Sequence, residues 1–179
     1  MHFVSGGLRA AFLLGKNDLQ NRRNHEGIIV KINGGDGKTC KQRGEWAELC
    51  FMARAADRGF NVSRPHGDSA SYDVGVEDNG RFMRVQVKST TFRRKGSFTC
   101  NIVGPKRQRY ASGKLDFFAV YLVPIDVWYI IPFEIVERNL SLNLTPRKGH
   151  KFFQYMEGWN LLRGKALPSR RRTQGSLYT

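Results

Sequence analysis

Cysteine is scarce in this sequence, and its few thiols follow no metal-binding pattern. Only Cys40, Cys50 and Cys100 occur among the 179 residues, an odd number without any CxxC spacing. Such a set argues against a disulfide framework and against a zinc site, and it favours reduced thiols in the cytoplasm. The four histidines are equally scattered, so they add no zinc-ligand pattern.

Long apolar runs are also absent. No stretch approaches the roughly 18 residues that a membrane-spanning helix needs. The N-terminal stretch LRAAFLLG is interrupted by Arg9 and has no basic region before it. We therefore expect no membrane association and no secretory signal peptide.

Acidic residues are the third deficit, because fifteen Asp and Glu face thirty Lys and Arg and leave a formal net charge of +15. An excess of this size favours a polyanionic partner, most often nucleic acid, and a basic structural protein of a nucleoprotein particle would share it. The 40% hydrophobic content argues against a disordered chain. The length allows one domain with its own core.

The composition divides the chain into three parts. Residues 1–42 are rich in Gly, Asn and basic residues, and we expect a weakly ordered basic extension there. Residues 43–162 carry the periodic apolar patterns of a globular domain. Residues 163–179 contain basic residues and no acid, so we expect a basic tail that is available to a phosphate backbone.

Apolar periodicity predicts a helix, then a series of strands, then a second helix. Helical spacing from Trp46 to Ala56 predicts the first helix, which we expect to end at Gly59. Short β-prone runs predict strands at 61–65, 71–78, 81–90, 97–103, 116–123 and 127–132, with a tight turn at Asn79-Gly80. A second helix is predicted by apolar residues at helical spacing: Phe152, Tyr155, Met156, Trp159 and Leu162. This order indicates one α/β domain with a mixed, mainly antiparallel central sheet flanked by helices.

Acidic residues gather in one window of this basic chain. Between residues 45 and 78, seven acids face three cations, which gives a local charge of −4. A protein that binds phosphates is expected to avoid carboxylates near them unless a divalent cation lies between, and Mg²⁺ prefers carboxylate, water and phosphate oxygens. The window therefore favours a metal site that acts on phosphate groups.

Within this window the spacing brings a few polar side chains together. Glu45 and Glu48, at positions i and i+3, share one flank of the first helix. Counting outward from the predicted turn places Asp73 near Gln86 and Lys88, which share one face of the returning strand. A solvated hairpin face with ordinary charge pairs would show the same pattern, so these residues alone leave both interpretations open.

The ordered set of motifs resembles the PD-(D/E)xK nuclease superfamily. The matching stretches are GEWAE, RGFNVSRPHGDSASYDVGV, RVQVKS, KLDFFAVY and VWYIIP, which lie within residues 42–162. They look like the branch of bacterial group I intron-encoded homing endonucleases, and they are more distantly similar to archaeal Holliday-junction resolvases. The resemblance implies a restriction-endonuclease-like core that hydrolyses phosphodiester bonds in DNA with Mg²⁺, or with Mn²⁺ in its place.

The resemblance also implies a role for each matched residue. Lys88 matches the motif lysine, which would orient or help deprotonate the attacking water and stabilise charge on the phosphate. Asp73 matches the principal metal ligand. The other implied ligands are Gln86, the carbonyl of Val87 and, directly or through water, Glu48, with Glu45 as an accessory.

Two departures from the family pattern bear on activity. Tyr72 rather than proline precedes Asp73, and Gln86 occupies a position usually held by an acid. A neutral amide can still offer an oxygen to Mg²⁺, but the site loses one negative charge. The homing-endonuclease branch resembles this sequence in using glutamine there. The alternative to an enzyme is a non-catalytic nucleic-acid-binding module that retains the nuclease fold.

Basic residues outside the motifs are candidates for contacts with the DNA backbone. Arg84 shares the polar face of the motif strand, where it would contact phosphate or pair with Glu77. The other candidates lie in loops and in the tail: Arg93, Arg94, Lys95, Lys106, Arg107, Arg109, Arg170, Arg171 and Arg172. Because cutting both strands usually needs two sites, we expect a homodimer or a higher homo-oligomer. The sequence does not distinguish homing, restriction, repair and junction cleavage.

Overall fold

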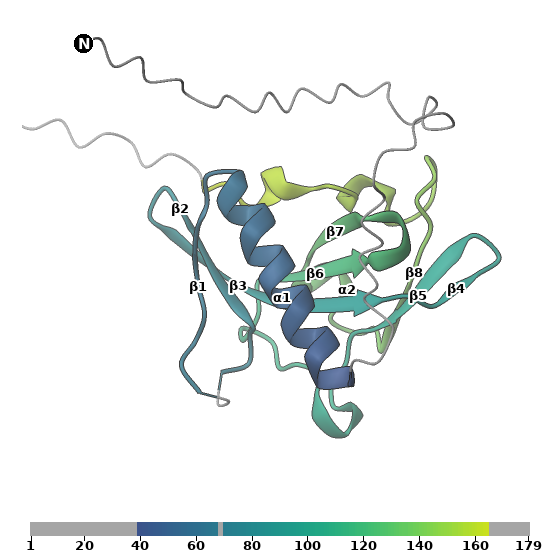
Figure 1. Ribbon diagram of the computed structural model, residues 1–179, viewed down its shortest axis with the longest axis horizontal. Helices are drawn as coiled ribbons and strands as arrows, with labels where there is room; N and C mark the ends of the chain where they lie inside the picture. Colours follow the sequence, from purple (N-terminus) through teal and green to yellow (C-terminus); the bar gives the residue numbers. More distant parts are fainter. Residues whose placement is uncertain (1–38, 68–69, 165–179) are drawn as a thin grey trace, which may run out of the picture. The chain divides into compact units, whose positions relative to one another are not determined.

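Figure 1 shows a helix lying across one face of a five-stranded sheet, with a smaller three-stranded sheet beside it. The computed structural model describes residues 39–67 and 70–164. The expected extension up to residue 38 and the expected tail from residue 165 onward lie outside the described residues, and so do Arg170, Arg171 and Arg172. No helix of the described residues is long and apolar enough to cross a membrane.

The first helix, α1 (Cys40–Asp57), begins earlier than its apolar pattern predicts. Thr39 is its N-cap, because the Thr39 hydroxyl accepts a hydrogen bond from the Gln42 N–H (3.2 Å) and the Gln42 side chain accepts one from the Thr39 N–H (2.8 Å). This capping box starts the helix six residues before the apolar pattern does. The helix ends where expected, with Gly59 in a left-handed conformation (φ 79°) just beyond it.

The buried face of α1 differs from the predicted one. Ala47, Phe51 and Ala55 recur every fourth residue and are fully buried, so they form the stripe that faces the sheet. Leu49, which the pattern places inside, is 55% exposed. Trp46 packs at the margin of the stripe. The sequence pattern therefore found the edge of the buried face rather than its centre.

The central sheet places β3 (Arg81–Thr90) in its middle. On one side follow β2 (Val74–Asp78) and the edge strand β1 (Asn61–Ser63), and on the other follow β6 (Phe117–Leu122) and β7 (Val127–Pro132). β3 and β6 run parallel, whereas the other neighbouring pairs of this sheet are antiparallel. The expected mixed, mainly antiparallel sheet is confirmed.

β2 and β3 form the hairpin that the sequence predicts. Asn79 and Gly80 both adopt left-handed conformations, with φ of 50° and 74°, as a two-residue hairpin turn requires. Val74, the first residue of β2, pairs with Val85. This register brings the residue before β2 opposite Gln86.

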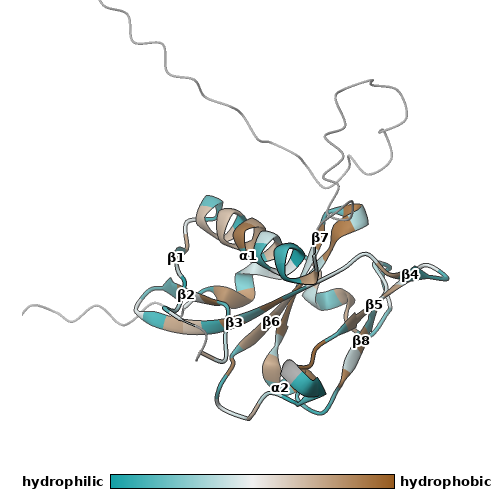
Figure 2. Ribbon diagram, turned by 60° about the horizontal axis from the view of Figure 1, so that its bottom comes forward, coloured by the Kyte–Doolittle hydropathy of each residue, from teal (hydrophilic) through white to brown (hydrophobic). Residues whose placement is uncertain are grey.

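A second sheet of β4 (Arg93–Arg94), β5 (Ser97–Asn101) and β8 (Ser141–Leu144) was not expected. The prediction of a loop is therefore wrong for Arg93 and Arg94, because the two arginines belong to β4. Lys95 (φ 48°) and Gly96 (φ 83°) form the turn that leads into β5. Figure 2 shows β4 as a hydrophilic strand.

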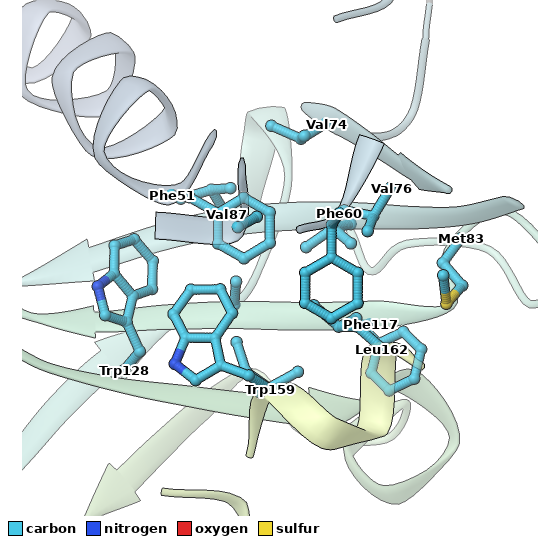
Figure 3. Packing of buried hydrophobic residues seen from close by; sticks show 14 of the residues in the cluster. Phe51, Phe60, Val74, Val76, Met83, Val87, Phe117, Trp128, Trp159 and Leu162 are labelled. Atoms are coloured by element: carbon cyan, nitrogen blue, oxygen red, sulfur yellow. The ribbon is translucent and has the colours of Figure 1, made fainter. Parts of the chain in front are cut away.

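Two apolar cores lie on opposite faces of the central sheet, which explains the continuous apolar run of β6. Every residue of β6 is buried. Phe117 and Ala119 belong to the core under α1, together with Phe51 and Trp128, and Figure 3 shows this packing. Phe118, between them in sequence, belongs to the core under the second sheet. Alternation along a strand thus serves both cores.

The second predicted helix is wrong. The segment instead contains two short 3-10 turns, Phe153–Tyr155 and Trp159–Leu162. Glu157 between them has a left-handed φ of 51°, which interrupts any helix. Phe152 belongs to the core under the second sheet and Trp159 to the core under α1. The helical spacing arose because one segment contributes apolar side chains to two separate cores.

The remaining elements are short connections. A helical turn, α2 (Phe133–Val136), follows β7. One 3-10 turn, Pro105–Arg107, precedes β6. A second, Val123–Ile125, joins β6 to β7.

Candidate active site

Asp73 lies at the point where β2 begins to pair with β3. The predicted strand at 71–78 included Asp73, whereas in the structure Asp73 directly precedes β2. Its N–H donates a hydrogen bond to the Val85 carbonyl (3.0 Å), so the backbone still follows the hairpin. This contact turns the Asp73 side chain toward the middle of β3.

The Asp73 carboxylate is hydrogen-bonded by two neighbouring residues of β3. Its Oδ2 atom accepts a hydrogen bond from the Val87 N–H (2.8 Å) and another from the Gln86 side-chain amide. Burial raises the pKa of Asp73, whereas the Val87 N–H and the charge of Lys88 oppose that rise. The expected convergence of Asp73, Gln86 and Lys88 is therefore present in the structure.

The backbone of Val87 points the same way. In a strand, the N–H and C=O groups of one residue face the same side. Because the Val87 N–H reaches Asp73, its carbonyl lies on the Asp73 side of β3 as well. The oxygen is thus placed on the edge where the family's metal ligands are expected.

Glu48 reaches the site from α1. Its side chain is 17% exposed and forms an ion pair with Arg64, with 2.7 Å between Oε2 and Nη2. Burial and the negative charge of Asp73 raise the pKa of Glu48, and Arg64 opposes this. A carboxylate whose pKa is raised by burial and by a second carboxylate forms, with that neighbour, a site that a cation would stabilise. Glu45 lies further out, with its carboxylate 4.0 Å from Lys41.

Lys88 is held by a residue that sequence reasoning missed. Its Nζ atom donates a hydrogen bond to the Tyr110 hydroxyl (3.0 Å) and lies 5.4 Å from the centroid of the Tyr110 ring. The ring packs edge-to-face on buried Phe118, with the centroids 5.6 Å apart. The only sequence signal for Tyr110 was its place directly after the basic segment 105–109.

Two clefts meet at Asp73 and Lys88. The first, of about 590 Å³, is lined by both residues together with Glu45, Glu48 and Arg64. The second, of about 570 Å³, lies on the other side and adds Gln86, Tyr110, Arg109 and Lys114. Asp73 and Lys88 therefore stand between two hollows that are open to a substrate.

Arg84 does not pair with Glu77, one of its two expected partners. Its guanidinium binds Asp116, with 2.9 Å between Nε and Oδ2, and also donates to the Gly113 carbonyl. The backbone N–H of Arg84 donates to the same Asp116 oxygen (2.7 Å). These contacts lower the pKa of Asp116. Arg84 thus links β3 to the start of β6.

The other basic candidates are exposed. Arg93, Arg94 and Lys95 belong to the β4–β5 hairpin, with the Arg93 guanidinium 5.7 Å from the Phe98 ring centroid. Lys106 and Arg107 adopt left-handed conformations in succession, with φ of 52° and 59°. Arg109 follows them and lines the second cleft. Of these residues, Arg109 is the one that lines a cleft of the site.

The donor set fits a hard divalent cation. Among residues 39–67 and 70–164, no three His, Cys, Asp or Glu side chains come close enough to hold a metal by themselves. The site instead combines the carboxylates of Asp73 and Glu48 with the amide of Gln86 and the carbonyl of Val87. These are all oxygen donors, which suit Mg²⁺ and Mn²⁺, whereas zinc sites are built mainly from Cys and His ligands.

Comparison with known proteins agrees with this geometry. Among solved structures, the chain is similar to the bacterial homing endonuclease I-Ssp6803I, with 25% sequence identity and a TM-score of 0.59. The match covers 69% of this chain and 91% of that protein. No curated protein sequence matches the chain. Residues 38–162 match the family model described as PD-(D/E)XK endonuclease. The chain belongs to the PD-(D/E)XK endonuclease family.

Proposed function

We propose that the chain is a divalent-metal-dependent endonuclease that hydrolyses phosphodiester bonds in DNA. The observation that carries this proposal is the convergence of Asp73, Gln86 and Lys88 across the β2–β3 hairpin. Asp73 and Lys88 also share the first cleft with Glu48. These four residues would be its catalytic residues. Glu45, at the rim of the cleft, would be an accessory.

The residues that would hold the ion are Asp73, Glu48, Gln86 and Val87. The amide of Gln86 carries both a donor and an acceptor, so its nitrogen can bond Asp73 while its oxygen faces a cation. Mg²⁺ is the proposed ion, with Mn²⁺ as a substitute. When bound, it would polarise the phosphodiester and make a water molecule more acidic.

Lys88 would act on the phosphate. An ammonium group has three N–H donors, and Tyr110 accepts one of them. The remaining donors are available to the attacking water and to a phosphate oxygen. Their charge would stabilise the negative charge that develops on the phosphate as the bond breaks.

Exposed basic residues would hold the DNA backbone. Arg109 lines the second cleft, and the β4–β5 hairpin carries Arg93, Arg94 and Lys95. We include Lys106, Arg107 and the basic segments on either side of the described domain in this role. Arg84 would contribute less, because Asp116 neutralises it. We further propose a cytoplasmic homodimer or higher homo-oligomer, since cutting both strands takes two sites.

The proposal is tested by incubating the protein with supercoiled, linear and branched DNA in Mg²⁺, Mn²⁺ or EDTA. We expect cleavage that needs the metal and is lost in Asp73→Asn and Lys88→Met. Lys148→Met is the control, because Lys148 is exposed and lines neither cleft. The DNA form that is cut best separates junction cleavage from cleavage of intact duplex.

The second candidate is a non-catalytic nucleic-acid-binding module. Gln86 favours it, because the amide removes a negative charge from the site. Under this alternative the protein binds DNA with a steep salt dependence, yet it leaves the DNA intact in Mg²⁺ and Mn²⁺. That result would refute the proposal that the protein is an endonuclease.

A further inference from the structure

Arg64 forms an ion pair with Glu48, one of the proposed metal ligands. It follows the edge strand β1 and begins the segment that leads to Asp73. Its Nη2 atom donates a hydrogen bond to Glu48 Oε2 at 2.7 Å, inside the first cleft. The Arg64 side chain is 47% exposed, so it has room to change its conformation.

The charges around the first cleft give Arg64 a distinct position. Lys88 is held by Tyr110, and Lys41 lies beside Glu45 at the rim. Arg64 is the cation that reaches Glu48, and its charge also acts on Asp73. It is therefore the counter-ion of Glu48, and it adds to the charge of Lys88 at Asp73.

A divalent cation and the Arg64 guanidinium would compete for the carboxylate of Glu48. An ion held by Glu48 and Asp73 would use the carboxylate that Arg64 now binds, and it would repel the guanidinium at short range. The displaced side chain would remain in a cleft that leads to Lys88. A guanidinium binds phosphate through two parallel N–H donors, so a DNA backbone in this cleft offers Arg64 a new partner.

We propose that Arg64 is an exchangeable counter-ion, which pairs with Glu48 in the metal-free site and binds a DNA phosphate once a divalent cation is present. The inference rests on the proposed function, and it makes Arg64 a substrate-positioning residue of that reaction. It couples the two binding events, because the bound metal releases the side chain that then holds the DNA.

The test compares Arg64→Met with Arg147→Met, a matched control. Arg147 is exposed and lines neither cleft, so its removal takes away the same charge elsewhere. Binding of Mn²⁺ alone is measured by calorimetry. Binding of a fluorescein-labelled duplex is measured by anisotropy in EDTA and again in Ca²⁺, with a gel to verify that the duplex stays intact. Arg64→Gln repeats each measurement with a different uncharged side chain.

For both Arg64 variants we expect Mn²⁺ to bind about 3- to 10-fold more tightly than to the wild type, because a competing cation is gone. In EDTA their affinity for DNA should follow that of Arg147→Met. In Ca²⁺ they should bind DNA several-fold more weakly than the control, with a salt slope lower by about 0.9. Arg64→Lys keeps the charge and should restore part of the DNA affinity.

Equal Mn²⁺ affinity in wild type and Arg64→Met would overturn the inference, and so would a loss of DNA affinity that is the same in EDTA and Ca²⁺. Either result points to an ordinary ion pair or to a phosphate contact that is independent of metal. If either result were found while the wild type still bound Mn²⁺ and cut DNA, the inference about Arg64 would fail and the proposed function would stand. A wild type that binds no Mn²⁺ would overturn the proposed function as well.

Discussion

Replacing Tyr110 with phenylalanine isolates the hydrogen bond that holds Lys88. The change removes one oxygen and keeps the ring, which packs on Phe118 and lies beside the Lys88 ammonium. The free energy of unfolding should change little, because Tyr110 is only half-buried. The expected loss therefore concerns the orientation of Lys88.

The magnitude follows from the contact. A hydrogen bond to a charged group is worth about 1.5–3 kcal/mol when it is well formed, and partial exposure reduces it to about 1 kcal/mol. Since about 1.4 kcal/mol corresponds to a factor of ten, kcat should fall about fivefold in Tyr110→Phe. KM for DNA should change little, because Tyr110 acts through Lys88.

A double-mutant cycle checks the reasoning. The cleavage rate is measured under single-turnover conditions for Tyr110→Phe, Lys88→Met and the double variant. If Tyr110 positions Lys88, adding Tyr110→Phe to Lys88→Met has no further effect. An equal fivefold loss in both backgrounds would show that Tyr110 acts independently of Lys88, and the reasoning would be wrong.

Three further predictions concern stability, each measured by chemical unfolding. Tyr129→Phe should leave the free energy of unfolding unchanged or raise it by up to about 1 kcal/mol. The reason is that the buried Tyr129 hydroxyl has no hydrogen-bond partner among the described residues. A clear decrease in the free energy of unfolding would show that the hydroxyl has a partner. Phe51→Ala should cost about 3–5 kcal/mol, since Phe51 is fully buried between Trp128 and Trp159, and a cost below 1 kcal/mol would contradict this packing. Arg84 lowers the pKa of Asp116, so the pair stabilises the fold above the ordinary carboxyl pKa and ceases to do so as the pH falls through the lowered value. Asp116→Asn should therefore be destabilised at neutral pH and approach the wild type in acid, whereas a gap that persists below the lowered pKa would refute this assignment.

The β2–β3 hairpin shows how much of the site could be predicted from the sequence. Its turn is encoded by the local pair Asn79-Gly80, and the register follows by counting residues from that turn. Counting placed Asp73 near Gln86 and Lys88, and the structure has it hydrogen-bonded to Gln86. Local signals were sufficient here because the two strands are adjacent in the sequence.

Contacts between distant segments could not be predicted in this way. The hydrogen bond from Lys88 to Tyr110 and the ion pair of Glu48 with Arg64 join separate elements, and no periodic pattern marks them. The same holds for β8, which pairs with β5 across some forty residues. The segment from Phe152 to Leu162 was mistaken for a helix because spacing alone does not tell whether side chains share one core.

The hydrogen bond from Val87 to Asp73 has a consequence for how mutations at this site should be interpreted. β2 starts at Val74, so the Asp73 carboxylate, rather than a backbone carbonyl, satisfies the next N–H along β3. The proposed metal ligand thus also supplies the last hydrogen bond between the two strands. Asp73→Ala would remove that rung and let the hairpin fray at the place where its geometry matters most, whereas Asp73→Asn retains an oxygen that can accept. A substitution at Asp73 would therefore change the local fold together with the proposed metal site.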